Sequence, residues 1–308
     1  MENISESMQR WMDKKHLNDN YQKLMAQVYN DPDVREFLEQ HQADLSEETI
    51  DRSSAKLYEY VNARDRLAAG KTVFAPGYQP ALIINDHLID VTYSPTAEQQ
   101  EKMRSQTVRQ RVNAVMMPKM IREANFNNFA QDEQRLAAYA AALDFTDSYE
   151  SNPKGFHKGL YLYGSFGVGK TYLLGAIANH LAANGFKTTL VHFPSFAVDM
   201  KNAIGDNRVA EKLDAVKKAP VLMLDDIGAD SMSAWVRDEV LGVILEYRMQ
   251  SELPTFFSSN FSMNQLETEH LQITQRGDEE PLKAKRLMQR IRFLTSEIVM
   301  VGKNRRLD

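Results

Sequence analysis

Cysteine does not occur among the 308 residues of this chain. Its absence excludes disulfides and every metal site that needs a thiolate ligand. Long apolar runs are also missing, since none approaches the roughly 20 residues of a membrane span. The first residues include Glu2 and Glu6 and no apolar segment, so they do not resemble a secretory signal. We therefore expect a soluble cytoplasmic protein without a membrane partner.

The chain also has no excess of basic residues. It contains 42 acidic and 37 basic residues, and its formal net charge is −5. A uniformly basic coat for nucleic acid is therefore excluded, although local basic patches are not. Hydrophobic residues make up 43% of the chain, enough to bury a substantial core. The length favours two domains.

The most informative stretch is a glycine-rich loop of the pattern G-x-x-x-x-G-K-[ST]. It reads Gly164, Ser165, Phe166, Gly167, Val168, Gly169, Lys170, Thr171. An apolar run at 159–163 before it predicts a strand, and the Leu- and Ala-rich run at 172–183 after it predicts a helix. Backbone N–H groups and a helix N-terminus bind phosphate in this context. We expect the loop to bind a nucleotide, with Lys170 on the β and γ phosphates and the Thr171 hydroxyl on Mg²⁺.

Polar side chains follow two further apolar runs, 221–224 and 254–259, which predict strands. Ligands of open α/β sheets bind at the carboxyl edge, where these side chains lie. We expect Asp225 to help hold Mg²⁺ and Asp226 to orient and deprotonate the attacking water. Asn260 is a candidate to orient the same water. The alternatives are that Asp226 caps the next turn and that Asn260 belongs to an ordinary exit loop.

A basic stretch lies near the carboxyl end of the chain. Its eight Lys and Arg residues are Lys283, Lys285, Arg286, Arg290, Arg292, Lys303, Arg305 and Arg306. Arg286 and Arg290 are four residues apart and share a helix face. Such a face could contact DNA phosphates, reach the γ-phosphate of a neighbouring subunit, or simply be solvated, as most surface charges are.

The expected elements change in character along the chain. Up to about Tyr60 three helices are expected, the second starting at Asp31-Pro32 and the third near Ser46. A hairpin around an Asn85-Asp86 turn and a polar connecting helix at 97–122 follow. From Phe126 onward alternating helices and strands predict an α/β domain with a parallel sheet. The expected domains are residues 1–125 and 126–308.

Several segments carry a resemblance to a known family. They are 159–171, 220–232, 235–240, 253–261, 286–292 and 304–307. They are similar to bacterial replicative-helicase loaders of the DnaC/DnaI type, which are AAA+ ATPases, and residues 56–60 extend the likeness to the DnaI subgroup of Gram-positive bacteria. The resemblance implies an AAA+ P-loop ATPase domain with a parallel central sheet, preceded by a smaller, mostly helical domain with a β-hairpin.

The implied function is ATP-dependent loading of the hexameric replicative helicase onto DNA during initiation and restart. The implied partners are that helicase, single-stranded DNA, other primosome proteins and further copies of the chain, bound through the AAA+ domain. Arg286 is the implied arginine finger, and Arg305 or Arg306 the sensor-2 arginine that touches the nucleotide. Residues 196–204 match the insert that aligns DNA and neighbouring subunits.

The chain departs from the family in one respect. The best-known DnaI proteins bind zinc in the N-terminal domain through cysteines and a histidine. Here residues 66–96 contain no cysteine, Gln79 stands where the histidine is expected, and His87 is alone. Zinc is therefore not expected.

The sequence is compatible with three other functions. The first is a transposition helper ATPase of the insertion-sequence type, a related class, although the acidic helical N-terminal region favours a protein partner over a DNA-binding module. A small-molecule kinase would need an acceptor pocket and an arginine-rich lid, for which no counterpart is evident. A nucleotide-binding adaptor that never hydrolyses ATP is the third alternative.

Overall fold

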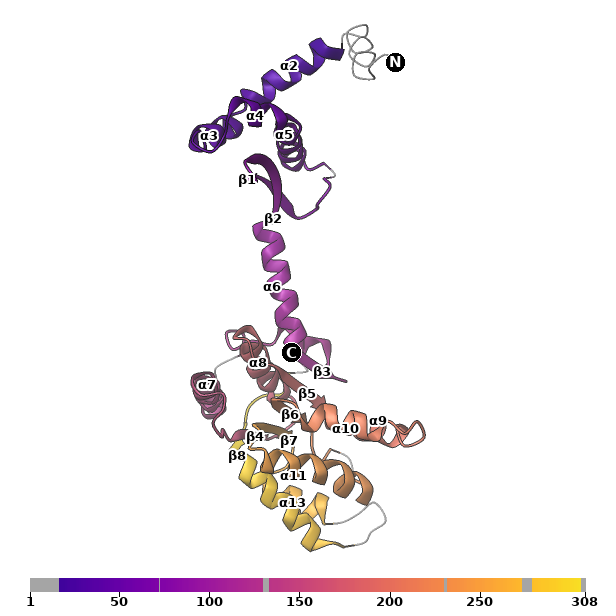
Figure 1. The fold of residues 1–308 in the computed structure, drawn as a ribbon. Helices are drawn as coiled ribbons and strands as arrows, with labels where there is room; N and C mark the ends of the chain where they lie inside the picture. Colours follow the sequence, from indigo (N-terminus) through magenta and orange to yellow (C-terminus); the bar gives the residue numbers. More distant parts are fainter. Residues whose placement is uncertain (1–16, 72, 130–132, 230–231, 273–278, 306–308) are drawn as a thin grey trace. The chain divides into compact units, whose positions relative to one another are not determined.

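The computed structural model describes residues 17–71, 73–129, 133–229, 232–272 and 279–305 (Figure 1). The chain divides into two compact units, Met1–Arg104 and Ser105–Asp308. The division falls within α6 (Ala97–Arg111), earlier than the expected boundary near residue 125. The reason is that residues after α6 join the sheet of the second unit.

The first unit consists of helices followed by a β-hairpin. Its elements are α2 (Leu17–Tyr29), α3 (Pro32–Gln40), α4 (Glu47–Arg52), α5 (Ser54–Ala68), β1 (Tyr78–Asn85) and β2 (Leu88–Pro95). The third expected helix is split, because buried Ser53 ends α4. Its hydroxyl donates to the Thr49 carbonyl at 2.8 Å and accepts from the Ile89 N–H at 3.0 Å. Ser53 thereby ties the helices to the hairpin, around a small core that includes Val34, Leu57 and Ile89.

The hairpin turn lies one residue later than expected. Asn85 pairs with Leu88, so Asp86 and His87 form the two-residue turn, and both have positive φ (48° and 61°). Two left-handed residues match the twist of antiparallel strands in such turns. Gln79 pairs with Ser94 at the other end of the hairpin, far along the strands from His87.

Arg64 on α5 joins three aspartates in the first unit. It donates to Asp31 at 2.6 Å, to Asp33 at 2.6 Å and to Asp65 at 2.7 Å. Asp31 is also the N-cap of α3. The hydrogen bond from Arg64 holds the pKa of Asp31 below its ordinary value of 3.8.

Replacing Arg64 by Ala should destabilise the first unit by about 1–3 kcal/mol, because the Asp31 carboxylate loses a charge-assisted partner. A lowered aspartate pKa stabilises the fold above the unfolded-state pKa of 3.8, and this contribution disappears as the pH falls through the lowered value. Thermal unfolding at neutral and acid pH measures both effects. Exposed Arg52 provides the matched control; equal losses for Arg52→Ala and Arg64→Ala would contradict the assignment.

The second unit is built on a six-stranded sheet of order β3-β5-β6-β7-β4-β8, and its pairings are all parallel. The parallel sheet predicted from the sequence is confirmed. Its strands are β3 (Val112–Val115), β4 (Gly159–Tyr163), β5 (Thr188–His192), β6 (Val221–Asp225), β7 (Thr255–Ser259) and β8 (Thr295–Val299). The helices between them are η1 (Lys119–Glu123), η2 (Glu133–Arg135), α7 (Leu136–Ser151), α8 (Lys170–Ala183), α9 (Phe193–Asn202), α10 (Val209–Lys217), η3 (Val236–Leu241), α11 (Gly242–Gln250), α12 (Met263–Gln265), η4 (Leu266–Leu271) and α13 (Pro281–Leu294).

Two apolar clusters cover the faces of this sheet. One gathers side chains of α7 and α8, such as Phe145, Leu173 and Ile177; the other gathers those of α11 and α13, such as Ile244 and Ile291. Figure 1 shows these helix pairs on opposite sides of the strands. The sheet is therefore the middle layer of three, and its carboxyl edge is open to ligands.

Two local expectations were wrong, and one helical segment was not predicted. The connecting helix was expected to reach residue 122, but it ends at Arg111, and Val112–Val115 pairs with β5 as an edge strand. Residues 196–204 were expected to form a short helix, but α9 starts at Phe193, since Pro194 fits the first turn of a helix. Residues 263–271 form a helical segment that was not expected, capped by Ser262. Within the described ranges, no helix combines the length and the apolar character that crossing a membrane requires.

Candidate nucleotide-binding site

The glycine loop connects β4 to α8 in a conformation that requires its glycines. Gly167 and Gly169 have φ of 78° and 99°, where side chains with a Cβ are strained. A Cβ on Gly167 would also lie 1.8 Å from the Asn304 Oδ1 atom. The local sequence therefore folds into a tight turn that ends at the N-terminus of α8, where backbone N–H groups are available to an anion.

Lys170 is the first residue of α8 and is largely buried. Its ammonium donates to the Gly164 carbonyl at 2.7 Å, the Ser165 carbonyl at 2.9 Å and Asn260 Oδ1 at 2.9 Å. Asn260 follows β7, so the contact joins two neighbouring strand ends of the sheet. The structure thus brings together two side chains that lie 90 residues apart in the sequence.

Asp225 ends β6 and is 4% exposed. Its carboxylate accepts from the Thr171 hydroxyl at 2.9 Å and from the Ser258 hydroxyl. Burial raises the pKa of Asp225, and these two hydrogen bonds oppose that effect. A buried carboxylate beside a hydroxyl is an oxygen-donor set that suits Mg²⁺, whose charge would offset the cost of burying the anion.

Ser258 was not predicted, yet it contacts both aspartates. Its oxygen also accepts from the Asp226 N–H at 2.9 Å. This bond helps hold Asp226 in a left-handed conformation, φ 62°, which costs a non-glycine residue free energy. The sequence signal for Ser258 was its place at the end of the strand next to β6.

Asp226 extends from this turn with its carboxylate about one-third exposed. Asn260 Nδ2 donates to Asp226 Oδ1 at 3.3 Å, and His192 Nε2 lies 4.0 Å from Asp226 Oδ2. His192 ends β5 and its Nδ1 lies 2.7 Å from the Ser195 hydroxyl. Sequence reasoning missed His192, although it too ends a strand at this edge.

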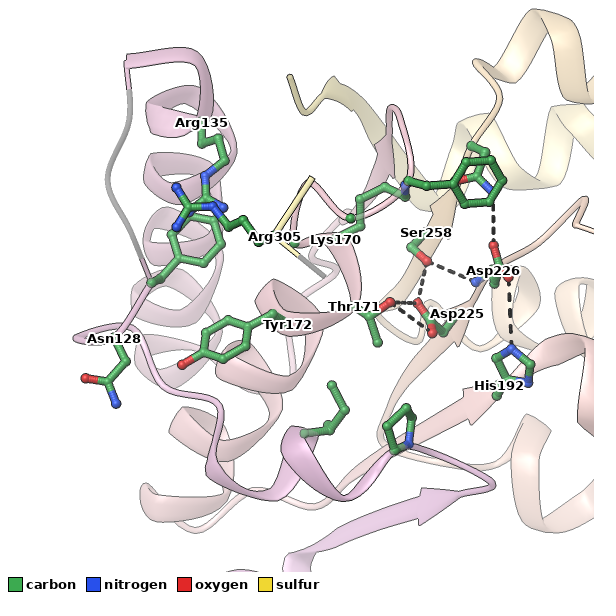
Figure 2. Close-up of a pocket in the computed structure, with 17 residues that line it drawn as sticks. Asn128, Arg135, Lys170, Thr171, Tyr172, His192, Asp225, Asp226, Ser258 and Arg305 are labelled. Carbon is green, nitrogen blue, oxygen red and sulfur yellow. Dashed lines mark hydrogen bonds and ion pairs between the residues drawn. The ribbon is translucent and has the colours of Figure 1, made fainter. Parts of the chain in front are cut away.

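These groups line one cavity of about 350 Å³ (Figure 2). The predicted residues that line it are Phe166, Gly167, Gly169, Lys170, Thr171, Asp225, Asp226, Asn260 and Arg305. The lining residues that were not predicted are Pro118, Ile121, Asn128, Phe129, Arg135, Tyr172, His192 and Ser258. The remaining loop residues act through their backbone: the Gly164 and Ser165 carbonyls accept from Lys170, and the Val168 carbonyl accepts from buried Arg135 at 3.0 Å.

The carboxyl-terminal arginines have different places. Arg305 lines the cavity, and its N–H donates to the Gly167 carbonyl at 3.0 Å. Arg306 lies outside the described residues. Arg286 is exposed on α13 and is not among the residues that line the cavity.

The other basic side chains of α13 are mostly engaged within the unit. Arg290 donates to the Gly242 carbonyl at 3.1 Å and pairs with Glu246, and Arg292 pairs with Glu267 at 2.7 Å. Lys283 pairs with Asp238 and Glu280. The Lys285 and Arg286 side chains make no hydrogen bond or ion pair with any residue that the structure describes. Arg286 is therefore the arginine of this helix that is available to a partner.

Comparison with known proteins identifies the family. Residues 1–93 match the family model for the primosomal protein DnaI N-terminus, and residues 86–290 match that for the IstB-like ATP binding protein. The replicative helicase loader DnaI of Bacillus subtilis (strain 168) is 39% identical over 99% of each chain. This chain belongs to the DnaI family of replicative helicase loaders.

Solved structures agree with this assignment. A crystal structure of DnaI is 44% identical, covers 66% of this chain and 98% of its own, and has a TM-score of 0.56. A crystal structure of the DnaC helicase loader covers 60% of this chain and 100% of its own, at 22% identity and a TM-score of 0.51, which supports the fold. The second unit has the AAA+ fold that the resemblance implied.

Proposed function

We propose that this protein binds ATP with Mg²⁺ and hydrolyses it to ADP and phosphate as a switch that controls loading of the replicative helicase onto DNA. The observation that carries the proposal is the meeting of Lys170, Asp225 and Asp226 in one cavity, in a chain related over its whole length to a helicase loader. A lysine, a buried carboxylate and a carboxylate about one-third exposed, all at one sheet edge, suit phosphate binding, metal binding and water activation respectively.

In this proposal each group keeps the place that the fold gives it. Lys170 and the loop N–H groups bind the phosphates, and Thr171 and Asp225 hold Mg²⁺, which when bound supplies positive charge that stabilises the transferring phosphoryl group. Asp226, oriented by Asn260, positions the attacking water and accepts its proton. The sensor-2 arginine that contacts the nucleotide is Arg305, which lines the cavity, or Arg306, which lies outside the described residues.

Replacing Asp226 by Asn should leave ATP binding nearly unchanged and slow hydrolysis by roughly 10²–10⁴-fold, the usual contribution of a general base. The amide keeps the size of the side chain but cannot accept the proton at neutral pH. Steady-state phosphate release and nucleotide affinity, measured on the same preparation, separate the two effects. If the Asp226→Asn variant hydrolyses ATP at the wild-type rate, Asp226 is not the general base and only caps the turn.

The partners follow from the family in this proposal. The first unit binds the replicative helicase, and the AAA+ unit binds single-stranded DNA, further copies of the chain and other primosome proteins. The α9 region, where Val198 and Ile204 are exposed, is the candidate insert that aligns DNA and neighbouring subunits.

The transposition helper ATPase is the second candidate, because the IstB-like model describes most of the AAA+ unit. The match of residues 1–93 to the DnaI N-terminus favours the loader. Co-purification with the tagged full chain decides between them: recovery of the replicative helicase by the full chain, but not by residues 105–308, is expected. Recovery of a transposase without the helicase would support the alternative.

A further inference from the structure

The cavity has a second end, away from the carboxylates. Figure 2 shows Asn128 and Tyr172 toward one side and Asp225, Asp226 and His192 toward the other. Besides Tyr172, the apolar lining includes Pro118, Ile121 and Phe129. Arg135 also lines the cavity, but its guanidinium lies 4.1 Å from the Phe129 ring centre and donates to the Val168 carbonyl. Asn128 is thus a neutral amide at the end of the cavity where Figure 2 also shows the Tyr172 ring, Arg135 and Arg305.

The turn that carries Asn128 is fixed to the helix of the phosphate loop. The Asn128 N–H donates to Asn125 Oδ1 at 2.8 Å, and the Asn125 N–H donates to the Tyr172 hydroxyl at 3.3 Å. Tyr172 directly follows Thr171, whose hydroxyl bonds Asp225. The two ends of the cavity therefore keep a set spacing, since both depend on the first turn of α8.

The Asn128 side chain is exposed toward solvent in the described structure, and none of its hydrogen bonds to described residues involves the amide. An amide presents a donor and an acceptor side by side. The 6-amino edge of adenine is complementary to it, since the amine donates and the adjacent ring nitrogen accepts, and Asn pairs with adenine in this way in nucleic-acid complexes.

We infer that Asn128 recognises the adenine base of the bound nucleotide: Oδ1 accepts from the 6-amino group, and Nδ2 donates to the neighbouring ring nitrogen. The inference rests on the proposed nucleotide site and names the base that the site selects. In this arrangement the Tyr172 ring, which lines the same end of the cavity, packs against the base, and the link from Asn128 through Tyr172 to Thr171 aligns the base with the phosphates.

The test compares ATP with purine riboside 5′-triphosphate, which lacks only the 6-amino group, by calorimetry in the presence of Mg²⁺. The full-length wild-type protein should bind ATP about tenfold more tightly, the range of one good amide–base pair. Asn128→Leu should remove this preference, because it loses both hydrogen bonds to ATP but only the Nδ2 hydrogen bond to purine riboside triphosphate, so its affinity for ATP should fall further. Asn127→Leu is the matched control, because Asn127 is an exposed neighbour outside the cavity lining, and it should keep the preference.

Two results would overturn the inference while leaving the nucleotide site standing: a wild-type protein that binds both triphosphates equally, or an Asn128→Leu variant that retains the preference. Equal loss of both affinities in Asn128→Leu would also overturn it, because that pattern means a structural role for the turn. A wild-type protein that binds neither triphosphate would refute the proposed function itself, and the inference with it.

Discussion

Lys170→Ala should abolish nucleotide binding and, with it, helicase loading. The Lys170 ammonium stands inside the loop, bonded to the Gly164 and Ser165 carbonyls and to Asn260, where it can turn to phosphate oxygens. Hydrogen bonds to charged groups contribute about 1.5–3 kcal/mol each, so losing two of them should weaken ATP binding by roughly a hundredfold or more.

Thermal unfolding with and without Mg·ATP measures this effect directly. A ligand at about 100 times its dissociation constant stabilises the folded state by about 2.7 kcal/mol, so wild type should show a clear rise in melting temperature. The Lys170→Ala variant, with affinity a hundredfold weaker or more, should gain at most about 0.4 kcal/mol at the same concentration. Lys187→Ala is the control, because exposed Lys187 precedes β5 at the opposite sheet edge. Helicase loading retained by Lys170→Ala would remove nucleotide from the mechanism.

Arg286→Ala should leave ATP binding nearly intact and suppress the hydrolysis that depends on assembly. Arg286 is exposed on α13 and lies outside the cavity lining of its own chain, so we propose that it acts on the nucleotide of a neighbouring subunit. An arginine supplied in trans accelerates phosphoryl transfer by about 10³–10⁵-fold in well-studied enzymes. A loss of this order is expected at protein concentrations, and with helicase and DNA, that promote assembly.

Lys285 makes the comparison specific, because it is the adjacent exposed cation on the same helix. Lys285→Ala should hydrolyse ATP like wild type under assembling conditions. Arg286→Lys should fall between wild type and Arg286→Ala, since an ammonium keeps the charge but loses the planar fork. Wild-type hydrolysis by assembled Arg286→Ala would show that Arg286 is not the finger.

Local sequence patterns predicted much of the second unit. The apolar run at 221–224 and the glycine loop were placed correctly because burial on both faces, and the need for positive φ, restrict which residues can occupy those positions. The hairpin was predicted with its turn one residue early. Asn85-Asp86 and Asp86-His87 are both compatible with a turn, and the cross-strand register that chose between them depends on how β2 packs against α5 and Ser53.

Elements without a strong pattern of their own were not predicted. Val112–Val115 is only four residues long and partly buried. So short a segment shows no alternation of apolar and polar residues that would separate it from the polar helix before it. Its strand conformation comes from pairing with β5, which lies more than seventy residues further along the chain. The role of Ser53 at the α4–α5 junction was not predicted for the same reason, because it depends on a hydrogen bond from Ile89 in the hairpin.

The sequence by itself determined that this chain carries a glycine loop between a strand and a helix, and two carboxylates at the end of a buried strand, because motif and periodicity are local properties. The tertiary structure alone decided which further residues complete the site. Ser258 and His192 reach the aspartates because β5, β6 and β7 are neighbours. Pro118, Ile121, Asn128 and Phe129 line the cavity because the chain after α6 passes alongside α8. Strand order and long-range packing depend on contacts across the whole unit, which no local pattern encodes.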